Sequence, residues 1–234
     1  MRLGLYGGTF NPIHHCHLLV AETAQTRLGL DTILFIPTGD PPHKPSSDIM
    51  PVLHRMEMVR LAIAPYPAFQ VSDLEITKPG LSYTIDTLRA LHRSYPADTR
   101  FIFIIGLDAF KDIASWKEPH SLLALCEFAV LSRPGSLFTS LRNIAMLGIE
   151  NSAPLERLDA GHGDAQEIRL ASGHSLWGLP MSPCYVSAQE IRTRLKEGHN
   201  LGNLLPSCVE SYILTHHLGD RGEGWSSPSS KNHG

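Results

Sequence analysis

The chain contains no long hydrophobic run and no run of basic residues, and these absences exclude whole classes of protein. Its longest apolar stretch, Phe101 to Ile105, is far shorter than the roughly 20 residues of a membrane-spanning helix. The N-terminus lacks the apolar segment after basic residues that marks a secretory signal. A formal charge of −3 and a pI near 6.5 argue against a nucleic-acid or anionic-membrane binder. We therefore expect a cytoplasmic protein with neither nucleic-acid nor membrane partners.

Cysteine is also scarce, and its spacing predicts no disulfide framework. The four cysteines lie far apart without a C-x-x-C pair, at Cys16, Cys126, Cys184 and Cys208. Cysteines spaced in this way, mostly in apolar surroundings, are typical of reduced thiols in the cytosol. At 234 residues and 42% hydrophobic content, the chain can bury one substantial core. A single domain is the expectation, and a homo-oligomer stays open.

Short apolar runs alternate with helical patterns along the first 146 residues. The predicted strands are Leu3 to Tyr6, Thr32 to Ile36, Phe69 to Val71, Phe101 to Ile105 and Phe128 to Leu131. Helices are predicted near residues 17–28, 51–64, 84–94, 119–125, 136–146 and 206–218. This rhythm predicts an α/β fold: a Rossmann-like parallel sheet with helices on both faces and ligands at the carboxyl ends of the strands.

The end of the chain and one internal stretch follow no such rhythm. Residues 148–180 are punctuated by glycine and proline and support no assignment. Residues 219–234 are rich in glycine and serine, and we expect a disordered tail there. The predicted domain is therefore 1–218.

The segment from Gly7 to His17 follows an apolar strand and leads directly into a helical pattern. Neither the dinucleotide fingerprint G-x-G-x-x-G nor the phosphate loop G-x-x-x-x-G-K-[ST] can be written on it. Its two glycines permit a tight turn with exposed N–H groups, and His14 and His17 stand at the N-terminus of the next helix. Backbone donors and the helix dipole favour an anion there, and imidazoles three residues apart face the same way. The segment predicts a triphosphate site.

A second segment lies at the opposite end of the chain. Ser187 and Glu190 have the spacing of a capping box, which predicts a helix beginning at Ser187. Arg192 lies early in that helix, and its planar guanidinium can reach the same anion as the histidines. Taken alone, the segment is equally typical of a capped surface helix with a solvated arginine.

Both segments resemble signatures of the nucleotidyltransferase superfamily of α/β phosphodiesterases. Residues 14–17 resemble its H-x-G-H signature, and residues 186–192 resemble its I-S-S-T-x-I-R signature. Asn11 stands where Asp is usual, which keeps a turn-forming side chain and loses a charge. Cys16 stands where glycine is usual, although glycine there lets phosphate approach the backbone closely. A thiol beside imidazoles at a helix N-terminus is also expected to have a lowered pKa and to be reactive.

Four further segments resemble bacterial nicotinate-nucleotide adenylyltransferases in order and approximate spacing, at residues 36–44, 81–88, 105–110 with Trp116, and 131–135. The resemblance covers about residues 1–218. Taken one at a time, these segments also fit a stiff loop, a helix cap, a core tryptophan and a turn after a strand.

The resemblance implies two sets of binding residues. For ATP they are Gly8, Thr9, Phe10, His14, His17, Gly106, Asp108, Ser187 and Arg192. For nicotinate mononucleotide they are Lys44, which adds charge near phosphate, Thr84, which meets the ring carboxylate, and Trp116, which stacks on the pyridine ring.

The implied reaction moves the adenylyl group of ATP to nicotinate mononucleotide and releases pyrophosphate. The phosphate of the mononucleotide carries close to two negative charges near pH 7, so it needs no general base. Catalysis then consists of alignment and neutralisation of charge, assigned to His14, His17 and Arg192. Mg²⁺ is expected on the ATP phosphates, with no metal ligand from the protein.

Three alternatives stay open at this point. The acceptor could be the amide mononucleotide or phosphopantetheine, although the middle segments argue against the second. The histidines could hold a metal for hydrolysis, but no H-E-x-x-H or carboxylate cluster accompanies them. Lastly, Cys16 could mark a domain that binds nucleotide without turnover.

Overall fold

A computed structural model describes residues 1–40, 49–78, 80–132 and 135–218. Lys44 and the predicted tail, 219–234, lie outside these ranges. Within them, no helix is long and apolar enough to cross a membrane.

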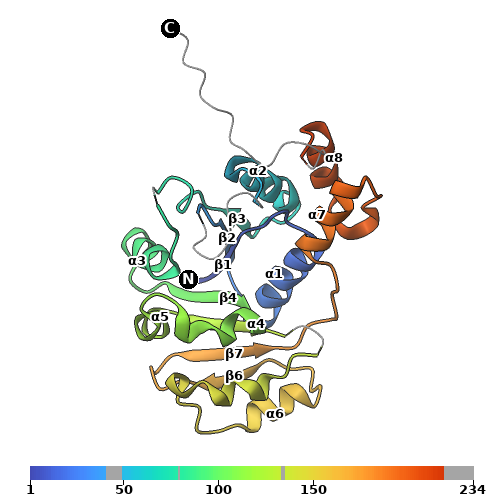
Figure 1. The fold of residues 1–234 in the computed structure, drawn as a ribbon. Coiled ribbons are helices and arrows are strands. Elements are labelled where there is room, and N and C mark those ends of the chain that lie inside the picture. Colours follow the sequence, from blue (N-terminus) through green and yellow to red (C-terminus); the bar gives the residue numbers. More distant parts are fainter. Residues whose placement is uncertain (41–48, 79, 133–134, 219–234) are drawn as a thin grey trace.

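The strands of the described residues form one sheet of seven, in the order β3-β2-β1-β4-β5-β7-β6 (Figure 1). They are β1 (Arg2–Gly8), β2 (Thr32–Pro37), β3 (Phe69–Val71), β4 (Arg100–Gly106), β5 (Glu127–Leu131), β6 (Gln166–Arg169) and β7 (Ser175–Leu179). All neighbours pair in parallel except β6 and β7, which are antiparallel. The predicted Rossmann-like parallel sheet is therefore confirmed, with one antiparallel strand at its edge.

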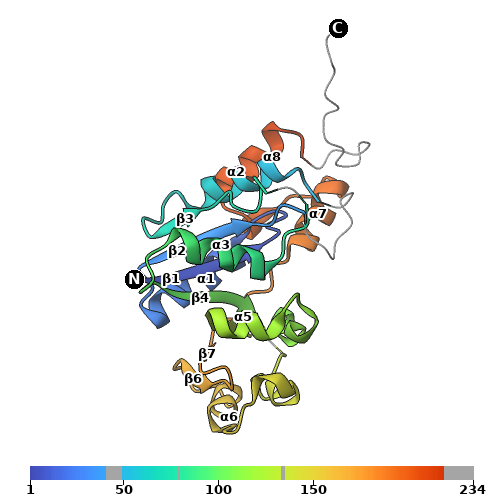
Figure 2. The same ribbon diagram turned by 90° about the vertical axis from the view of Figure 1, so that its left-hand side faces the viewer.

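Helices cover both faces of the sheet, as the apolar content of the central strands predicts (Figures 1 and 2). One hydrophobic cluster joins the sheet to α1 (His15–Leu28), α2 (Val52–Ile63), α7 (Ala188–Glu197) and α8 (Ser207–Thr215). The other joins it to α3 (Thr84–Ser94), α4 (Leu107–Lys111), α5 (Pro119–Leu125) and α6 (Ala153–Asp159). Short 3-10 turns are η2 (Ile113–Ser115), η3 (Phe138–Asn143), η4 (Ala145–Leu147) and η5 (Gly202–Leu204).

The predicted helix over residues 136–146 is wrong, because η3 and η4 occupy this stretch. Its buried apolar side chains, Phe138, Leu141 and Leu147, are three and six residues apart, and spacing in multiples of three suits 3-10 turns. The carboxylate of Asp159, on α6, accepts the N–H groups of Phe138 and Thr139 at 2.7 and 3.0 Å. This contact from another element caps the turn.

The other predicted strands and helices are confirmed to within a few residues at each end. The stretch 148–180, left without an assignment, contains α6, β6 and β7. The last predicted helix, 206–218, is shorter and runs over Ser207–Thr215.

Candidate active site

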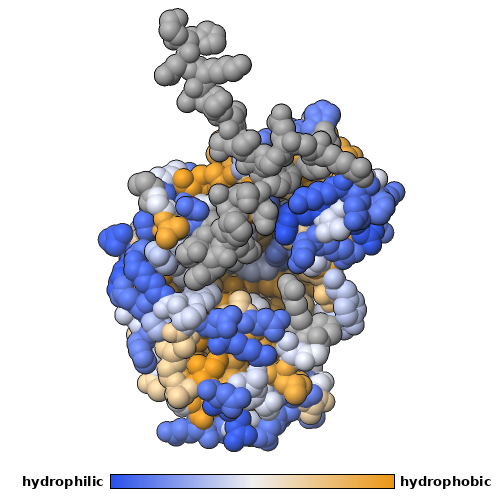
Figure 3. All heavy atoms as spheres, in the orientation of Figure 1, coloured by the Kyte–Doolittle hydropathy of each residue, from blue (hydrophilic) through white to orange (hydrophobic). Residues whose placement is uncertain are grey.

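The order of the strands changes direction between β1 and β4, so the connections from these neighbours leave toward opposite faces. Gly8 ends β1 and Gly106 ends β4, and both line one cavity of about 420 Å³. The two glycines therefore meet at the same edge of the sheet. Figure 3 shows hydrophobic residues in the middle of the molecule's face, between the hydrophilic surfaces of α3 and α7.

The two histidines of the first motif lie against each other where α1 begins. Their ring centroids are 3.7 Å apart, and the N–H of His14 donates to Nδ1 of His17 at 3.2 Å. With Nδ1 as an acceptor, a neutral His17 carries its proton on Nε2, which leaves that atom as a donor. His14 is 2% exposed, whereas His17 is half-buried. A phosphate entering from solvent would therefore meet His17 first.

The second motif lies beside the first. Nη1 of Arg192, on α7, donates to the main-chain oxygen of Asn11 at 2.8 Å. Ser187 is the N-cap of α7, and its Oγ accepts the N–H of Glu190 at 3.1 Å. In the predicted capping box the Glu190 carboxylate would accept the N–H of Ser187. It binds Arg194 at 2.8 Å instead, as an ion pair along the helix. Ser187 thus caps the N-terminus of α7, and Arg192 in this helix contacts the first motif.

A disulfide joins the two motifs, which makes the prediction of four reduced thiols wrong. Cys16, on α1, is bonded to Cys184, just before α7, with their Cα atoms 5.7 Å apart. The expectation of a reactive Cys16 thiol falls with it, because a disulfide sulfur does not titrate. Cys126 is buried and Cys208 exposed, and both are free thiols. Because two of the four cysteines are paired, the cysteines no longer support a cytosolic location.

Three of the middle segments line the same cavity. Thr84 is the first residue of α3, and Trp116 follows η2; both face the space that Gly8 and Thr9 line. Trp116 is half-buried and packs edge-to-face on Phe103, with ring centroids 6.2 Å apart. Trp116 is thus partly a core anchor and at the same time part of the cavity wall.

Other predicted residues lie differently. Asp108 is exposed and accepts a hydrogen bond from Oγ of Ser136 at 2.8 Å. A side chain at Gly106 would meet no atom within 4 Å, so open space adjoins this glycine. The Phe10 ring is 2% exposed and packs against His17, with centroids 5.1 Å apart, so only its backbone is available to a ligand.

A buried carboxyl, Glu75, also lines the cavity, and the motifs did not single it out. It is 8% exposed and accepts a hydrogen bond from Oγ1 of Thr87 at 2.6 Å. Burial raises the pKa of Glu75, while the Thr87 and Ser82 hydroxyls and the charge of Lys78 oppose the shift. A carboxyl that resists ionisation therefore faces the space where a substrate carboxylate is expected.

Arg55 is a second functional candidate that sequence reasoning missed. It lies on α2, is 1% exposed, and donates to the carbonyl oxygens of Met50, Thr9, Thr38 and Gly39. In the sequence it is one more charged residue in a helical pattern, so nothing local reveals its burial. The sequence held a clearer indication of the disulfide than of Arg55. If both motifs bind one anion, Cys16 and Cys184, which lie in or beside these motifs, are expected to be close to each other.

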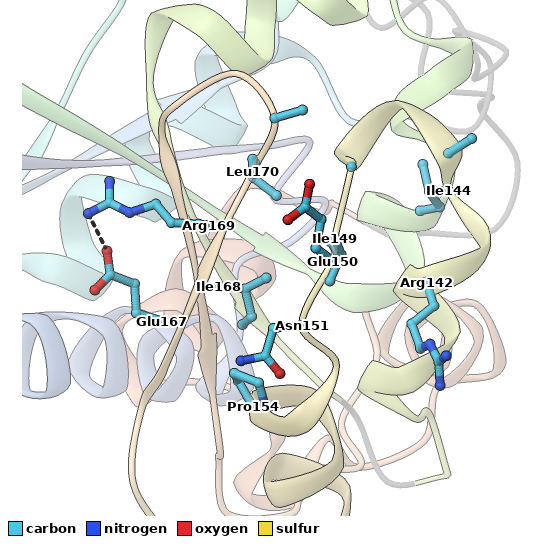
Figure 4. Close-up of a pocket in the computed structure, with 13 residues that line it drawn as sticks. Arg142, Ile144, Ile149, Glu150, Asn151, Pro154, Glu167, Ile168, Arg169 and Leu170 are labelled. Atoms are coloured by element: carbon cyan, nitrogen blue, oxygen red, sulfur yellow. Dashed lines mark ion pairs between the residues drawn. The ribbon is translucent and has the colours of Figure 1, made fainter.

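A larger cavity, of about 790 Å³, lies at the far edge of the sheet (Figure 4). Ile168 of β6 points toward Asn151 and Pro154, while Glu167 and Arg169 pair on the other side of the strand at 3.4 Å. None of the residues predicted for binding or catalysis lines it. In the described part of the chain, no group of three or more His, Cys, Asp or Glu side chains could hold a metal ion.

Residues 5–194 match the cytidylyltransferase-like family, and the chain belongs to this family of nucleotidyltransferases. Its relatives narrow the assignment. A probable nicotinate-nucleotide adenylyltransferase of Geotalea daltonii is 44% identical over 91% of this chain and 95% of its own length. One of Geobacter sulfurreducens is 42% identical over the same shares of the two chains. The chain therefore falls among the nicotinate-nucleotide adenylyltransferases, which confirms the family that the motifs indicated.

Solved structures show the same fold. Nicotinic acid mononucleotide adenylyltransferase of Plasmodium falciparum, complexed with NaAD, has a TM-score of 0.70, with 93% of this chain and 97% of that chain covered. A putative nicotinate-nucleotide adenylyltransferase of Vibrio parahaemolyticus has a TM-score of 0.60, with 93% and 94% covered. Both are 18% identical to this chain, so the likeness concerns the fold.

Proposed function

We propose that this chain transfers the adenylyl group of ATP to nicotinate mononucleotide, giving nicotinate adenine dinucleotide and pyrophosphate for NAD biosynthesis. One observation carries the proposal beyond family membership. The cavity at the switch between β1 and β4 brings together the loop after β1, the first turn of α3 and Trp116. It thus combines a phosphate-binding loop with an aromatic wall and a helix N-terminus.

Each wall suits one part of the acceptor. Trp116 offers a ring to the pyridine, and base–aromatic stacking contributes about 1 to 3 kcal/mol. Tyr83 and Thr84 line the cavity where α3 begins, and the N–H groups of a helix's first turn favour a carboxylate. The acid would therefore bind better than the amide. We assign Lys44 to phosphate charge by resemblance alone.

In this mechanism His14, His17 and Arg192 stabilise the negative charge of the triphosphate. The mononucleotide phosphate attacks the α-phosphorus of ATP, a new P–O bond forms, and the bond to pyrophosphate breaks on the opposite side. Nε2–H of His17 and the guanidinium of Arg192 donate to phosphate oxygens as charge moves toward pyrophosphate. Gly8, Thr9, Phe10 and Ser187 contribute backbone or hydroxyl groups, and Gly106 and Asp108 border the adenosine.

Mg²⁺ would arrive on the ATP phosphates and neutralise part of their charge. The catalytic domain in this proposal is 1–218, working in the cytoplasm, where both substrates would be supplied. A homo-oligomer stays a prediction that the single chain does not test.

Pyrophosphate release with ATP and Mg²⁺ tests the function. Release should require nicotinate mononucleotide and should be much slower with the amide. Equal rates with both would remove the proposed role of the α3 N-terminus, and turnover of phosphopantetheine alone would overturn the acceptor. Binding of ATP without release with any acceptor would indicate a non-catalytic domain.

A further inference from the structure

Arg55 is a buried cation that binds main-chain oxygen atoms. Its Nε donates to Met50 O at 3.0 Å, Nη1 to Thr9 O at 2.7 Å, and Nη2 to Thr38 O at 2.7 Å and to Gly39 O at 3.2 Å. Burial lowers the pKa of Arg55 to about 10, so the guanidinium stays charged near neutral pH. Burying a charge is costly unless its donors are satisfied, and here all its nitrogen atoms donate to carbonyl groups.

The carbonyl groups that Arg55 binds belong to the loops that build the cavity. Thr9 follows β1, and Thr38 and Gly39 follow β2, its parallel neighbour. Thr9 and Thr38 both line the cavity, whereas Arg55 does not. The guanidinium therefore links the two loops through their carbonyl groups without lining the cavity itself.

These loops have backbone shapes that need support. Phe10, directly after Thr9, has a φ of 44°, in the left-handed region that non-glycine residues seldom occupy. A Cβ at Gly39 would collide with the main-chain oxygen of Glu75. In a planar trans peptide, the C=O of one residue and the N–H of the next point in opposite directions. A Thr9 carbonyl held by Arg55 therefore turns the Phe10 N–H away from Arg55, and a held Thr38 carbonyl does the same for Gly39.

We propose that Arg55 is a positioning residue, which holds the Thr9 and Thr38 carbonyl groups so that the N–H groups of Phe10 and Gly39 face a substrate phosphate. Arg55 itself touches no substrate. The inference rests on the proposed function of the loop after β1 as a phosphate site.

A chain of contacts extends this support to the second motif. The side-chain oxygen of Asn11 accepts the N–H of Met50 at 3.0 Å, and Met50 O accepts Arg55. The main-chain oxygen of Asn11 accepts Arg192 at 2.8 Å. Because Arg55 and Arg192 bind carbonyl groups two residues apart in the same loop, a shift at Arg55 would also move this loop relative to Arg192.

The first experiment compares Arg55→Lys and Arg55→Met with a matched control on the same helix, Arg60→Lys, where the arginine is exposed. Lysine keeps the charge but cannot reach several carbonyl groups in fixed directions. We expect kcat of the folded Arg55→Lys enzyme to fall by about a hundredfold, since small misplacements of aligned groups have effects of this size. KM for ATP should change less, and Arg60→Lys should match the wild type in both.

Two outcomes separate the possible failures. Wild-type kcat in Arg55→Lys, at a temperature where it is fully folded, would overturn the positioning role. If His17→Ala also kept wild-type kcat, the proposed phosphate site would be at fault rather than Arg55 alone.

A second measurement needs no variant, in case both Arg55 variants fail to fold. Amide hydrogen exchange of the wild-type protein should slow at Phe10 and Gly39 when ATP with Mg²⁺, or nicotinate mononucleotide, is added. Unchanged exchange at both amides in saturating amounts of each substrate would overturn the proposal.

Discussion

Cys16 and Cys184 form a disulfide across 168 positions of the sequence. Cys16 lies one residue before His17, and Cys184 lies three residues before Ser187, the N-cap of α7. The bond therefore fixes the start of α1 to the segment that delivers Arg192. It also replaces the glycine expected in the first motif by a covalent link to the second.

Reduction of this disulfide should destabilise the protein. Closing so long a loop restricts the unfolded chain, so reduction should lower the free energy of unfolding by about 2 to 4 kcal/mol. Thermal melting with and without dithiothreitol measures the change, and a Cys16→Ser/Cys184→Ser variant should show no response to the reductant. Thiol titration of the denatured, unreduced protein should find only Cys126 and Cys208; reaction of all four cysteines would contradict the bond.

His17→Ala should lower kcat by at least about a hundredfold, because it removes a donor to charge that develops in the transition state. Stability should change little, since His17 is half-buried. His15, exposed on the same helix, supplies the control: His15→Ala should keep wild-type kcat. Near-normal kcat in His17→Ala would remove this residue from catalysis.

Arg192→Lys should stay well below wild-type activity, by about tenfold or more, because a charged hydrogen bond and the planar fork are lost. The remaining charge tests whether geometry matters at this position. Steady-state rates at saturating substrate measure the difference, and full activity would mean that diffuse positive charge is sufficient.

Trp116→Ala should raise KM for nicotinate mononucleotide by about tenfold or more, since stacking of about 1 to 3 kcal/mol is lost. KM for ATP serves as the internal control and should hardly change. Equal changes for both substrates, or a loss of folded protein, would mean that Trp116 mainly anchors the core beside Phe103.

Glu75 should make the protein less stable as the pH rises. Its folded pKa is raised above the ordinary value of 4.5, chiefly by burial. The folded state therefore holds the proton more tightly, and this stabilisation is present below pH 4.5 and lost as the pH rises through the folded pKa. Relative to Glu75→Gln, the wild type should lose free energy of unfolding over that interval.

Urea titrations at several pH values check this prediction. A flat difference for Glu75→Gln would mean that the Glu75 carboxyl ionises as easily in the folded protein as in the unfolded chain.

Local patterns were sufficient wherever one segment makes its own structure. The strand before Gly7, the helix after His14 and the cap at Ser187 depend on residues within a few positions of each other, so periodicity and turn chemistry predicted them. The stretch 148–180 has no such signal. There β6 is stabilised by pairing with β7, and β7 by pairing with β5 as well.

The sequence by itself determined the class of fold, the family and the two motifs proposed to bind phosphate, because each is written in contiguous residues. Only the tertiary structure decided the Cys16–Cys184 bond, the buried contacts of Arg55 and the place of Glu75 in the cavity. These depend on which distant segments become neighbours. The free energy of a buried charge or a disulfide depends on those neighbours, and the local periodicity of the sequence does not reveal it.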